Sequence, residues 1–191
     1  MHVAAQAAIM RRFILHRTGA MTRNKPAEPR TVRDFIFWAE RRFGKAGLYF
    51  GHGTDNARDE AVWLVTAALQ IPFDGLDAQA ERLLNESEQQ AVRGLVEARV
   101  GTRKPLAYLL HEAWFAGLKF YVDERVLVPR SLIGDFIHEQ FQPWIDPARV
   151  HRILDLCTGS GCIAIAAALA FPQARVDGAE WCPWRFVFDG L

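Results

Sequence analysis

One stretch of the chain, residues 152–168, holds the residue types best suited to binding a ligand. It reads RILDLCTGSGCIAIAAA: a short apolar run, an acid at Asp155, two glycines at 159 and 161, and an alanine-rich segment. Glycine lets a backbone turn tightly and approach a ligand closely. The amide groups at the start of a following helix then face whatever lies over that turn. The stretch therefore predicts a nucleoside-binding turn between a buried parallel strand and a helix.

Two ligands fit this turn. Residues 159–164 (GSGCIA) satisfy the dinucleotide pattern G-x-G-x-x-G/A, with an acid, Glu180, about 20 residues further on. S-adenosylmethionine is favoured instead by Asp155, because a carboxylate at the end of the strand could face the cationic amino-acid end of that ligand. A pyrophosphate would be repelled by the same charge. The spacing of the acid at Glu180 is common to both kinds of site.

Two segments resemble a known family. Residues 155–165 (DLCTGSGCIAI) resemble motif I of the class I S-adenosylmethionine-dependent methyltransferases. Residues 103–137 resemble the segment that joins the helical and catalytic domains of the protein N(5)-glutamine methyltransferases. Within this family, Cys157 and residues 128–131 (VPRS) look most like the branch that methylates a protein of the large ribosomal subunit. The release-factor branch has D-L-G-T-G-S-G and P-R-P-E-T instead.

The resemblance implies the function and the cofactor. It implies that S-adenosyl-L-methionine is bound and that a methyl group is transferred to a glutamine side-chain amide of a ribosomal protein. In the family, the acid at the position of Glu180 binds the ribose hydroxyls, although it is usually Asp. The implied cofactor-binding residues are Asp155, Cys157, Thr158, Gly159, Ser160, Gly161 and Glu180 on or beside the turn, and Phe115 and Arg130 at the border of the pocket.

The resemblance ends after Glu180. The last residues, 181–191 (WCPWRFVFDGL), do not continue the family pattern, and the substrate-binding tetrapeptide Asn-Pro-Pro-Tyr of this family does not occur in the sequence. We therefore interpret the chain as truncated or frameshifted after about residue 180, expect it to be inactive alone, and assign no catalytic residue.

The elements that must position the turn follow from periodicity and from turn residues. We expect an α/β fold that consists of an N-terminal helical domain, a β-hairpin linker and the incomplete first part of a Rossmann-like methyltransferase domain. The expected segments are a disordered basic extension at 1–30, a helical substrate-recognition domain at 31–101, a linker at 102–130 and a truncated cofactor domain at 131–191. Helices are expected at 31–43, 55–70, 78–84, 86–100, 131–141 and 163–171, and extended segments at 114–122, 126–128, 152–156 and 174–179.

Within the helical domain, one face of the first helix is apolar, and Thr31 with Asp34 predicts a capping box at its start. The charges of the helix at 86–100, among them Glu97 and Arg99, are interpreted as a solvated face. His52, in the loop after the first helix, is given no role.

Composition limits the function further. A formal net charge of +1 argues against nucleic acid as a direct, sequence-specific partner. The three cysteines have no zinc-site spacing and no paired framework, so we expect no metal and a reducing, cytoplasmic setting. No apolar run is long enough to span a bilayer, so we expect no membrane association. Two alternatives stay open: a fragment of an NAD-type oxidoreductase, and a non-enzymatic module that binds a ribosomal protein.

Overall fold

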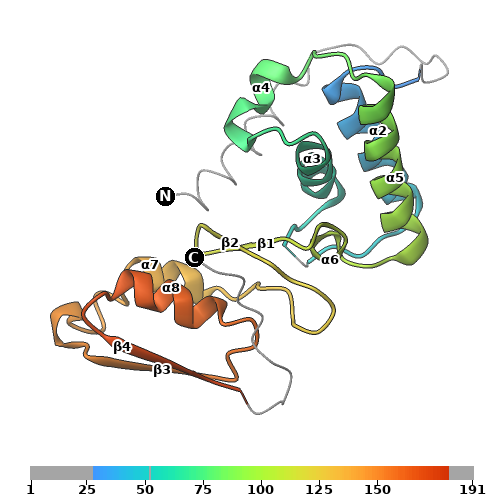
Figure 1. Cartoon of the computed structure of the whole chain (residues 1–191). Helices are drawn as coiled ribbons and strands as arrows, with labels where there is room; N and C mark the ends of the chain where they lie inside the picture. The colour runs from blue at the N-terminus through green and yellow to red at the C-terminus, as the bar shows by residue number, and fades with distance from the viewer. Residues whose placement is uncertain (1–27, 52, 181–191) are drawn as a thin grey trace. The chain divides into compact units, whose positions relative to one another are not determined.

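The computed structural model describes residues 28–51 and 53–180, which divide into two compact units between Leu110 and His111 (Figure 1). Most of the expected basic extension, His52 and the tail at 181–191 lie outside the described residues. The segment that we expected to link two domains, residues 102–130, is shared between the units. Its first part is helical and belongs to the first unit, whereas the β-hairpin belongs to the second.

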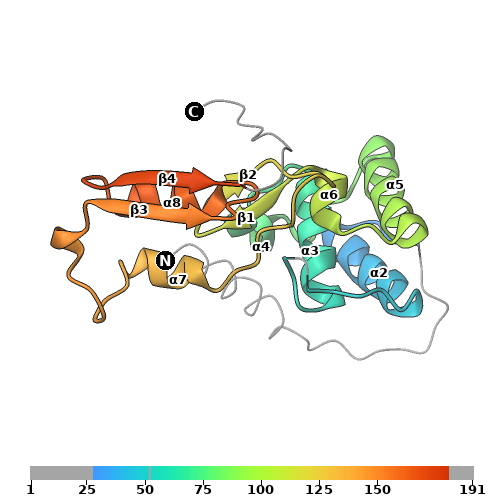
Figure 2. The same ribbon diagram turned by 90° about the horizontal axis from the view of Figure 1, so that it is seen from below.

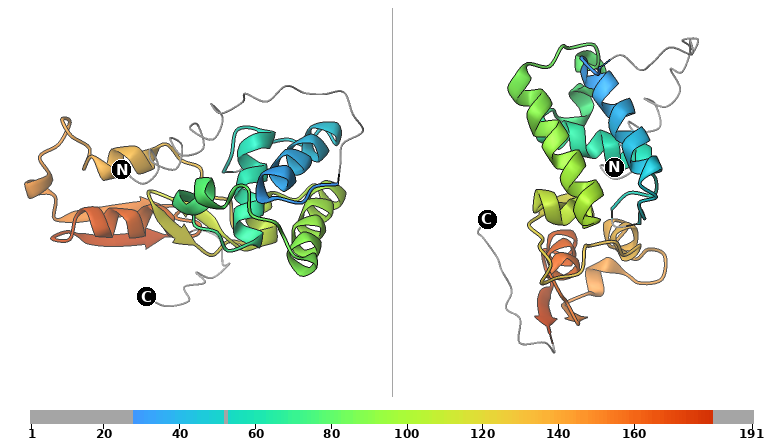
Figure 3. Two further views of the ribbon diagram at one scale, coloured as in Figure 1. Left: turned by 90° about the horizontal axis from the view of Figure 1, so that it is seen from above. Right: turned by 90° about the vertical axis from the view of Figure 1, so that its right-hand side faces the viewer.

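The first unit is helical. Three helices, α2 (Val32–Lys45), α3 (Ala57–Ala68) and α5 (Glu86–Thr102), pack against one another (Figure 1; Figure 3). The predicted capping box at the start of α2 is confirmed, because Thr31 and Asp34 exchange side-chain to backbone hydrogen bonds. The predicted apolar face of α2 is also confirmed, since all its members are fully buried. They are Val32, Phe35, Ile36, Ala39 and Phe43.

A buried ion pair joins two of these helices. Nε of Arg99 on α5 lies 2.6 Å from Oε1 of Glu60 on α3, and the two side chains are only 2% and 3% exposed. Arg99 also donates to the carbonyl of Tyr49, and the Thr54 hydroxyl donates to Glu60. The interpretation of Arg99 as part of a solvated face was wrong, because its partner comes from a helix 39 residues away and gives no local signal.

The helix expected at 78–84 is much shorter. The structure has a 3-10 turn, η1 (Phe73–Gly75), and one helical turn, α4 (Leu76–Gln79), followed by a turn at residues 80 and 81. The carbonyls of Ala80 and Arg82 accept hydrogen bonds from the first two amides of α2, at Arg33 and Val32. The first amides of a helix have no partner within it. Residues 80–84 therefore do not continue the helix, and two of their carbonyls supply acceptors to the start of α2. A short helix that was not predicted, α6 (Leu106–Leu110), ends this unit.

The second unit begins with the predicted hairpin of β1 (Ala113–Phe115) and β2 (Leu118–Phe120), which pair antiparallel. The predicted helix at 131–141 is only α7 (Ile133–His138), because Gln140 and Phe141 have positive φ angles that end it. Residues 126–128 form no strand.

The glycine-containing stretch forms the predicted strand, turn and helix. A short 3-10 turn, η2 (Pro147–Arg149), precedes the strand β3 (Arg152–Leu156). This strand pairs in parallel with β4 (Arg175–Ala179), and α8 (Cys162–Ala170) connects the two strands (Figure 2). Helix α8 packs on one face of the two strands, and α7 packs beside α8 (Figure 1; Figure 2). On the other face, Leu154 is 60% and Leu156 is 69% exposed. A parallel sheet is normally covered on both faces, so this unit leaves one apolar face open among the described residues.

We predict that Arg99→Met lowers the free energy of unfolding of the first unit by about 3 kcal/mol, because Glu60 would remain buried without its charged partner. Arg42→Met is the matched control, since Arg42 forms a surface pair with Glu97 between α2 and α5. Arg42→Met should lower the free energy of unfolding by less than about 1 kcal/mol. Urea unfolding followed by circular dichroism measures both. Equal costs for the two variants would contradict a special role for the buried pair.

Candidate nucleoside-binding turn

The turn between β3 and α8 holds three residues in the left-handed backbone region. The φ angles are 58° at Cys157, 56° at Gly159 and 76° at Gly161. Glycine adopts this region without strain, whereas a residue with a β-carbon pays for it. The related release-factor motif has glycine at the position of Cys157, so this chain keeps a side chain at a point where the backbone favours glycine.

The carboxylate of Asp155 holds the turn to the helix. Asp155 is 8% exposed, and its Oδ2 accepts a 2.5 Å hydrogen bond from the Thr158 hydroxyl and a 3.1 Å bond from the backbone N–H of Ala164. Ala164 is the third residue of α8, and Gly161 at the N-cap has no side chain to accept from it. Asp155, on the neighbouring strand, therefore caps the N-terminus of α8 in place of an N-cap side chain. The sequence alone did not indicate this inward contact.

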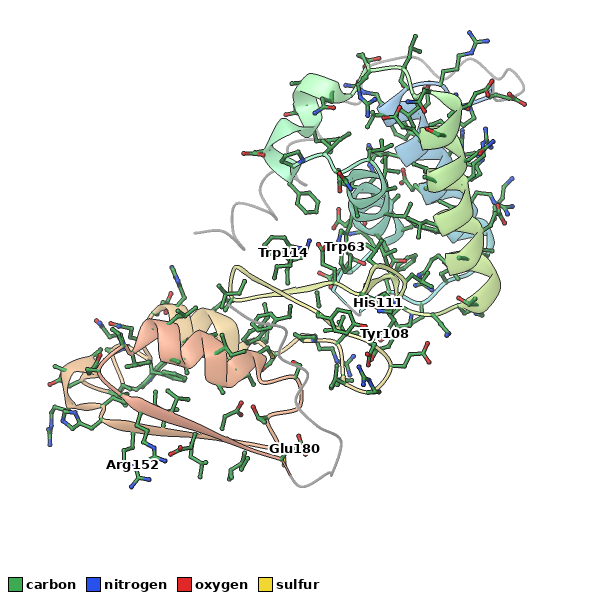
Figure 4. All side chains as sticks on the ribbon, viewed as in Figure 1. Trp63, Tyr108, His111, Trp114, Arg152 and Glu180 are labelled. Atoms are coloured by element: carbon green, nitrogen blue, oxygen red, sulfur yellow. The ribbon has the colours of Figure 1, made fainter. Side chains whose placement is uncertain are left out.

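Glu180 closes the other side of the turn. Its Oε2 accepts a 2.8 Å hydrogen bond from the backbone N–H of Gly159, and the N–H of Thr158 donates to the carbonyl of Ala179. Figure 4 shows Glu180 where β4 ends, beside the turn. Gly178 makes this approach possible, because a β-carbon there would lie 3.2 Å from the Thr158 hydroxyl oxygen. The ends of β3 and β4 are thus fastened to the same turn.

Several amides at the turn donate to acceptors within the chain. Gly161 donates to the carbonyl of Thr158, while Gly159 and Ala164 donate to carboxylates. A bound pyrophosphate needs free amides at such a turn and is repelled by a carboxylate beside it. The arrangement suits a ligand that brings hydroxyl or cationic groups better than one that brings phosphates.

Phe115 and Arg130, predicted at the border of the pocket, have different surroundings. Phe115 is 4% exposed and packs with Ile137, Cys162 and Ala166 in the core of the second unit. Arg130 is exposed. Ser160, the remaining predicted contact on the turn, is half-buried.

The two described cysteines differ in environment. Cys157 is exposed on the turn, whereas Cys162 is buried, and burial raises the pKa of the Cys162 thiol. Within residues 28–51 and 53–180, no cluster of three or more potential metal ligands occurs. The same residues include no helix that is long and apolar enough to cross a membrane.

One cavity of about 250 Å³ lies in the second unit. It lies between the hairpin and the C-terminal ends of α7 and α8. Its lining is mostly apolar, with His138 and Gln140 as polar members, and includes Ala116, Leu118, Ile137, Ala166, Leu169 and Ala170. The cavity contains no residue of the glycine turn and therefore does not form part of the candidate site.

Comparison with known proteins gives consistent matches. Residues 34–110 match the family of the PrmC N-terminal domain. The chain is 51% identical over 156 residues to a ribosomal protein uL3 glutamine methyltransferase of Burkholderia pseudomallei, and 48% identical over 161 residues to one of Bordetella pertussis. These matches cover 81% and 84% of this chain, and 51% and 54% of the relatives. The chain thus spans about half the length of the curated relatives it matches.

We predict that Asp155→Ala destabilises the second unit by about 1–3 kcal/mol, because the amide of Ala164 and the hydroxyl of Thr158 lose their acceptor. Asp177→Ala is the control, since Asp177 pairs with Arg175 at the surface of the same strand pair. Asp177→Ala should lower the free energy of unfolding by less than about 1 kcal/mol. Urea unfolding and hydrogen exchange at the first turn of α8 report the difference. Unchanged exchange at Ala164 in Asp155→Ala would refute the capping role.

Proposed function

We propose that the chain supplies the substrate-recognition and cofactor-binding part of a glutamine methyltransferase like the ribosomal protein uL3 glutamine methyltransferases that it resembles, with residues 34–110 similar to the PrmC N-terminal domain. In this proposal the second unit binds S-adenosyl-L-methionine at the glycine turn. The helical first unit recognises a ribosomal protein of the large subunit, uL3 by the names of the relatives. The observation that carries the proposal is the glycine turn itself, whose amides are bonded to two carboxylates.

The residues of the turn fit S-adenosylmethionine. Its ribose hydroxyls can donate to Glu180 at the end of β4, and its cationic amino-acid end is attracted by the negative charge of the turn. Gly159 and Gly161 let the backbone approach the ligand. Cys157, Thr158 and Ser160 complete the proposed contact surface, with Asp155 and Phe115 fixing its shape, and Arg130 remains a proposed contact at the border of the pocket.

When bound, the cofactor supplies a methyl group on a sulfonium sulfur. The acceptor in the proposed reaction is the nitrogen of a glutamine amide, which is a weak nucleophile because its lone pair is delocalised into the carbonyl. Catalysis must then come mainly from positioning and from hydrogen bonds to the amide. The family uses Asn-Pro-Pro-Tyr for this, and these 191 residues do not contain it. We therefore assign cofactor-binding residues and no catalytic ones.

A ribosomal protein substrate would place this activity in the cytoplasm. The helical unit is suited to recognition because its core is closed and its surface carries many charged groups, among them the surface pair of Arg42 and Glu97. The NAD-type alternative is disfavoured, since phosphate groups would lie beside Asp155 and Glu180. A purely structural ribosomal-protein-binding module would use the helical unit and leave the glycine turn without a ligand.

We predict that the chain binds S-adenosylmethionine weakly and NAD more weakly still, because the described residues form only one side of the pocket. Isothermal titration calorimetry compares the two ligands. Gly159→Val should abolish binding, since a β-branched residue does not tolerate a φ of 56°. Gly44→Val, in the helical unit, is the control and should leave the binding of S-adenosylmethionine unchanged. Tight NAD binding would overturn the proposed cofactor.

We predict that the 191-residue polypeptide alone transfers no methyl group to uL3. A chimera of residues 28–180 with the second half of the Burkholderia relative should transfer it, because the relative supplies the missing tetrapeptide and cover for the open sheet face. Radiolabelled S-adenosylmethionine and unmethylated uL3 provide the assay, with Gly159→Val in the chimera as the negative control. A folded but inactive chimera would contradict the proposed function, and activity of the polypeptide alone would contradict our account of catalysis.

A further inference from the structure

The loop segment that follows α2, residues 46–51, is held by two arginines at the C-terminal end of α5. The Arg103 guanidinium donates hydrogen bonds of 3.2 and 2.7 Å to the first two carbonyls of the segment. The Arg99 guanidinium donates one of 3.0 Å to the carbonyl of Tyr49. A loop at the surface normally gives its carbonyls to water, so this backbone is held more firmly than a simple connection between helices requires.

The buried ion pair of Glu60 and Arg99 fixes the loop on both sides of Tyr49. The hydroxyl of Thr54, a residue that is only 7% exposed, donates to Glu60. The carbonyl of Thr54 accepts a 2.7 Å hydrogen bond from the N–H of Gly51. A buried ion pair adds little net stability over well-packed apolar residues, because both charges lose their hydration. The contribution of this pair is therefore the position of the loop backbone.

Tyr49 is the side chain that this backbone presents to solvent. It is 72% exposed, whereas its neighbour Leu48 is 7% exposed. A β-carbon at Gly51 would lie 3.3 Å from the Tyr49 hydroxyl oxygen and 3.5 Å from Cζ, so the ring lies against the backbone of Gly51. The φ angle of Gly51 is 119°, which favours glycine there. The ring is thus supported without being buried, and a tyrosine placed in this way loses little conformational entropy when it binds a partner.

We propose that Tyr49 is an anchor through which the helical unit binds its protein substrate. The proposal rests on the function proposed above, which takes a ribosomal protein as that substrate. The partner is a polypeptide segment that lays an aliphatic or planar group on the ring and brings a polar group to the phenol hydroxyl. A nucleic acid could stack a base on the ring, but it also needs cations for its phosphates. Arg99 and Arg103 are both bonded to groups of this chain, which favours a polypeptide.

The test measures binding of purified uL3 to the full 191-residue chain by biolayer interferometry. Tyr49→Ala should raise the Kd about tenfold, because the ring and its hydroxyl are lost from the contact. Tyr49→Phe keeps the ring and should raise the Kd by a smaller factor. Phe37→Ala is the control, since Phe37 is an aromatic residue of α2 whose ring is already covered by the Arg58 guanidinium, 4.1 Å from the ring centroid. It should leave the Kd unchanged.

A further variant tests whether the held backbone contributes to the anchor. Arg103→Met removes the hydrogen bonds to the first two carbonyls of residues 46–51. Because Arg103 is exposed, the circular dichroism spectrum should not change. The Kd for uL3 should rise, by a smaller factor than in Tyr49→Ala. An unchanged Kd in Arg103→Met would contradict a role of the held backbone in binding.

The anchor and the proposed substrate can fail separately. If uL3 binds the unaltered chain and Tyr49→Ala equally well, the inference is wrong and the proposed substrate stands. If uL3 does not bind, but a release factor binds and is lost in Tyr49→Ala, the proposed substrate is wrong and the anchor stands. Binding of a ribosomal RNA fragment alone, or no binding that depends on Tyr49, would overturn the inference.

Discussion

A buried carboxylate must accept hydrogen bonds from its own chain, because it has lost its contact with water. Each unit of this protein contains one such carboxylate. In the helical unit, Glu60 receives Arg99 and the hydroxyl of Thr54. In the second unit, Asp155 receives the hydroxyl of Thr158 and the amide of Ala164. Each carboxylate joins two segments that would otherwise meet only through apolar contact, so the positions of the helices and of the turn depend on these groups.

The proposed site follows from the same constraint. Because Asp155 is committed to α8, the start of the helix is fixed relative to β3 before any ligand is present. Glu180 does the same for β4. The turn is therefore organised in advance, and a ligand that adapts to it loses little free energy in ordering the protein. The open face of β3 and β4 lies on the opposite side of the strands from α8. Its exposure therefore affects the packing of the sheet and not the conformation of the turn.

Features that depend on residues close together in the sequence were predicted correctly. Features that depend on contacts between residues far apart in the sequence were not. The capping box of Thr31 and Asp34 spans one turn, and the strand, glycine turn and helix at 152–170 are contiguous, so the sequence indicates them directly. The pairing of Glu60 with Arg99, and the non-helical path of residues 80–84, depend on partners far away in the chain. Phe115, predicted at the border of the pocket, packs in the core of the second unit, and the alternation of buried Ala113 and exposed Trp114 could have indicated that packing.

The segment at 80–84 also bears on how the helical unit folds. Its carbonyls accept from the first amides of α2, and Thr31 pairs with Leu83 as an isolated bridge. These contacts join residues that are far apart in sequence, so a mainly helical unit acquires a topology of the kind that slows folding. On a ribosome, the beginning of α2 emerges long before its acceptors do. Until residues 80–84 have been synthesised, those first amides are hydrated by water, and the helix can complete its N-terminus only afterwards.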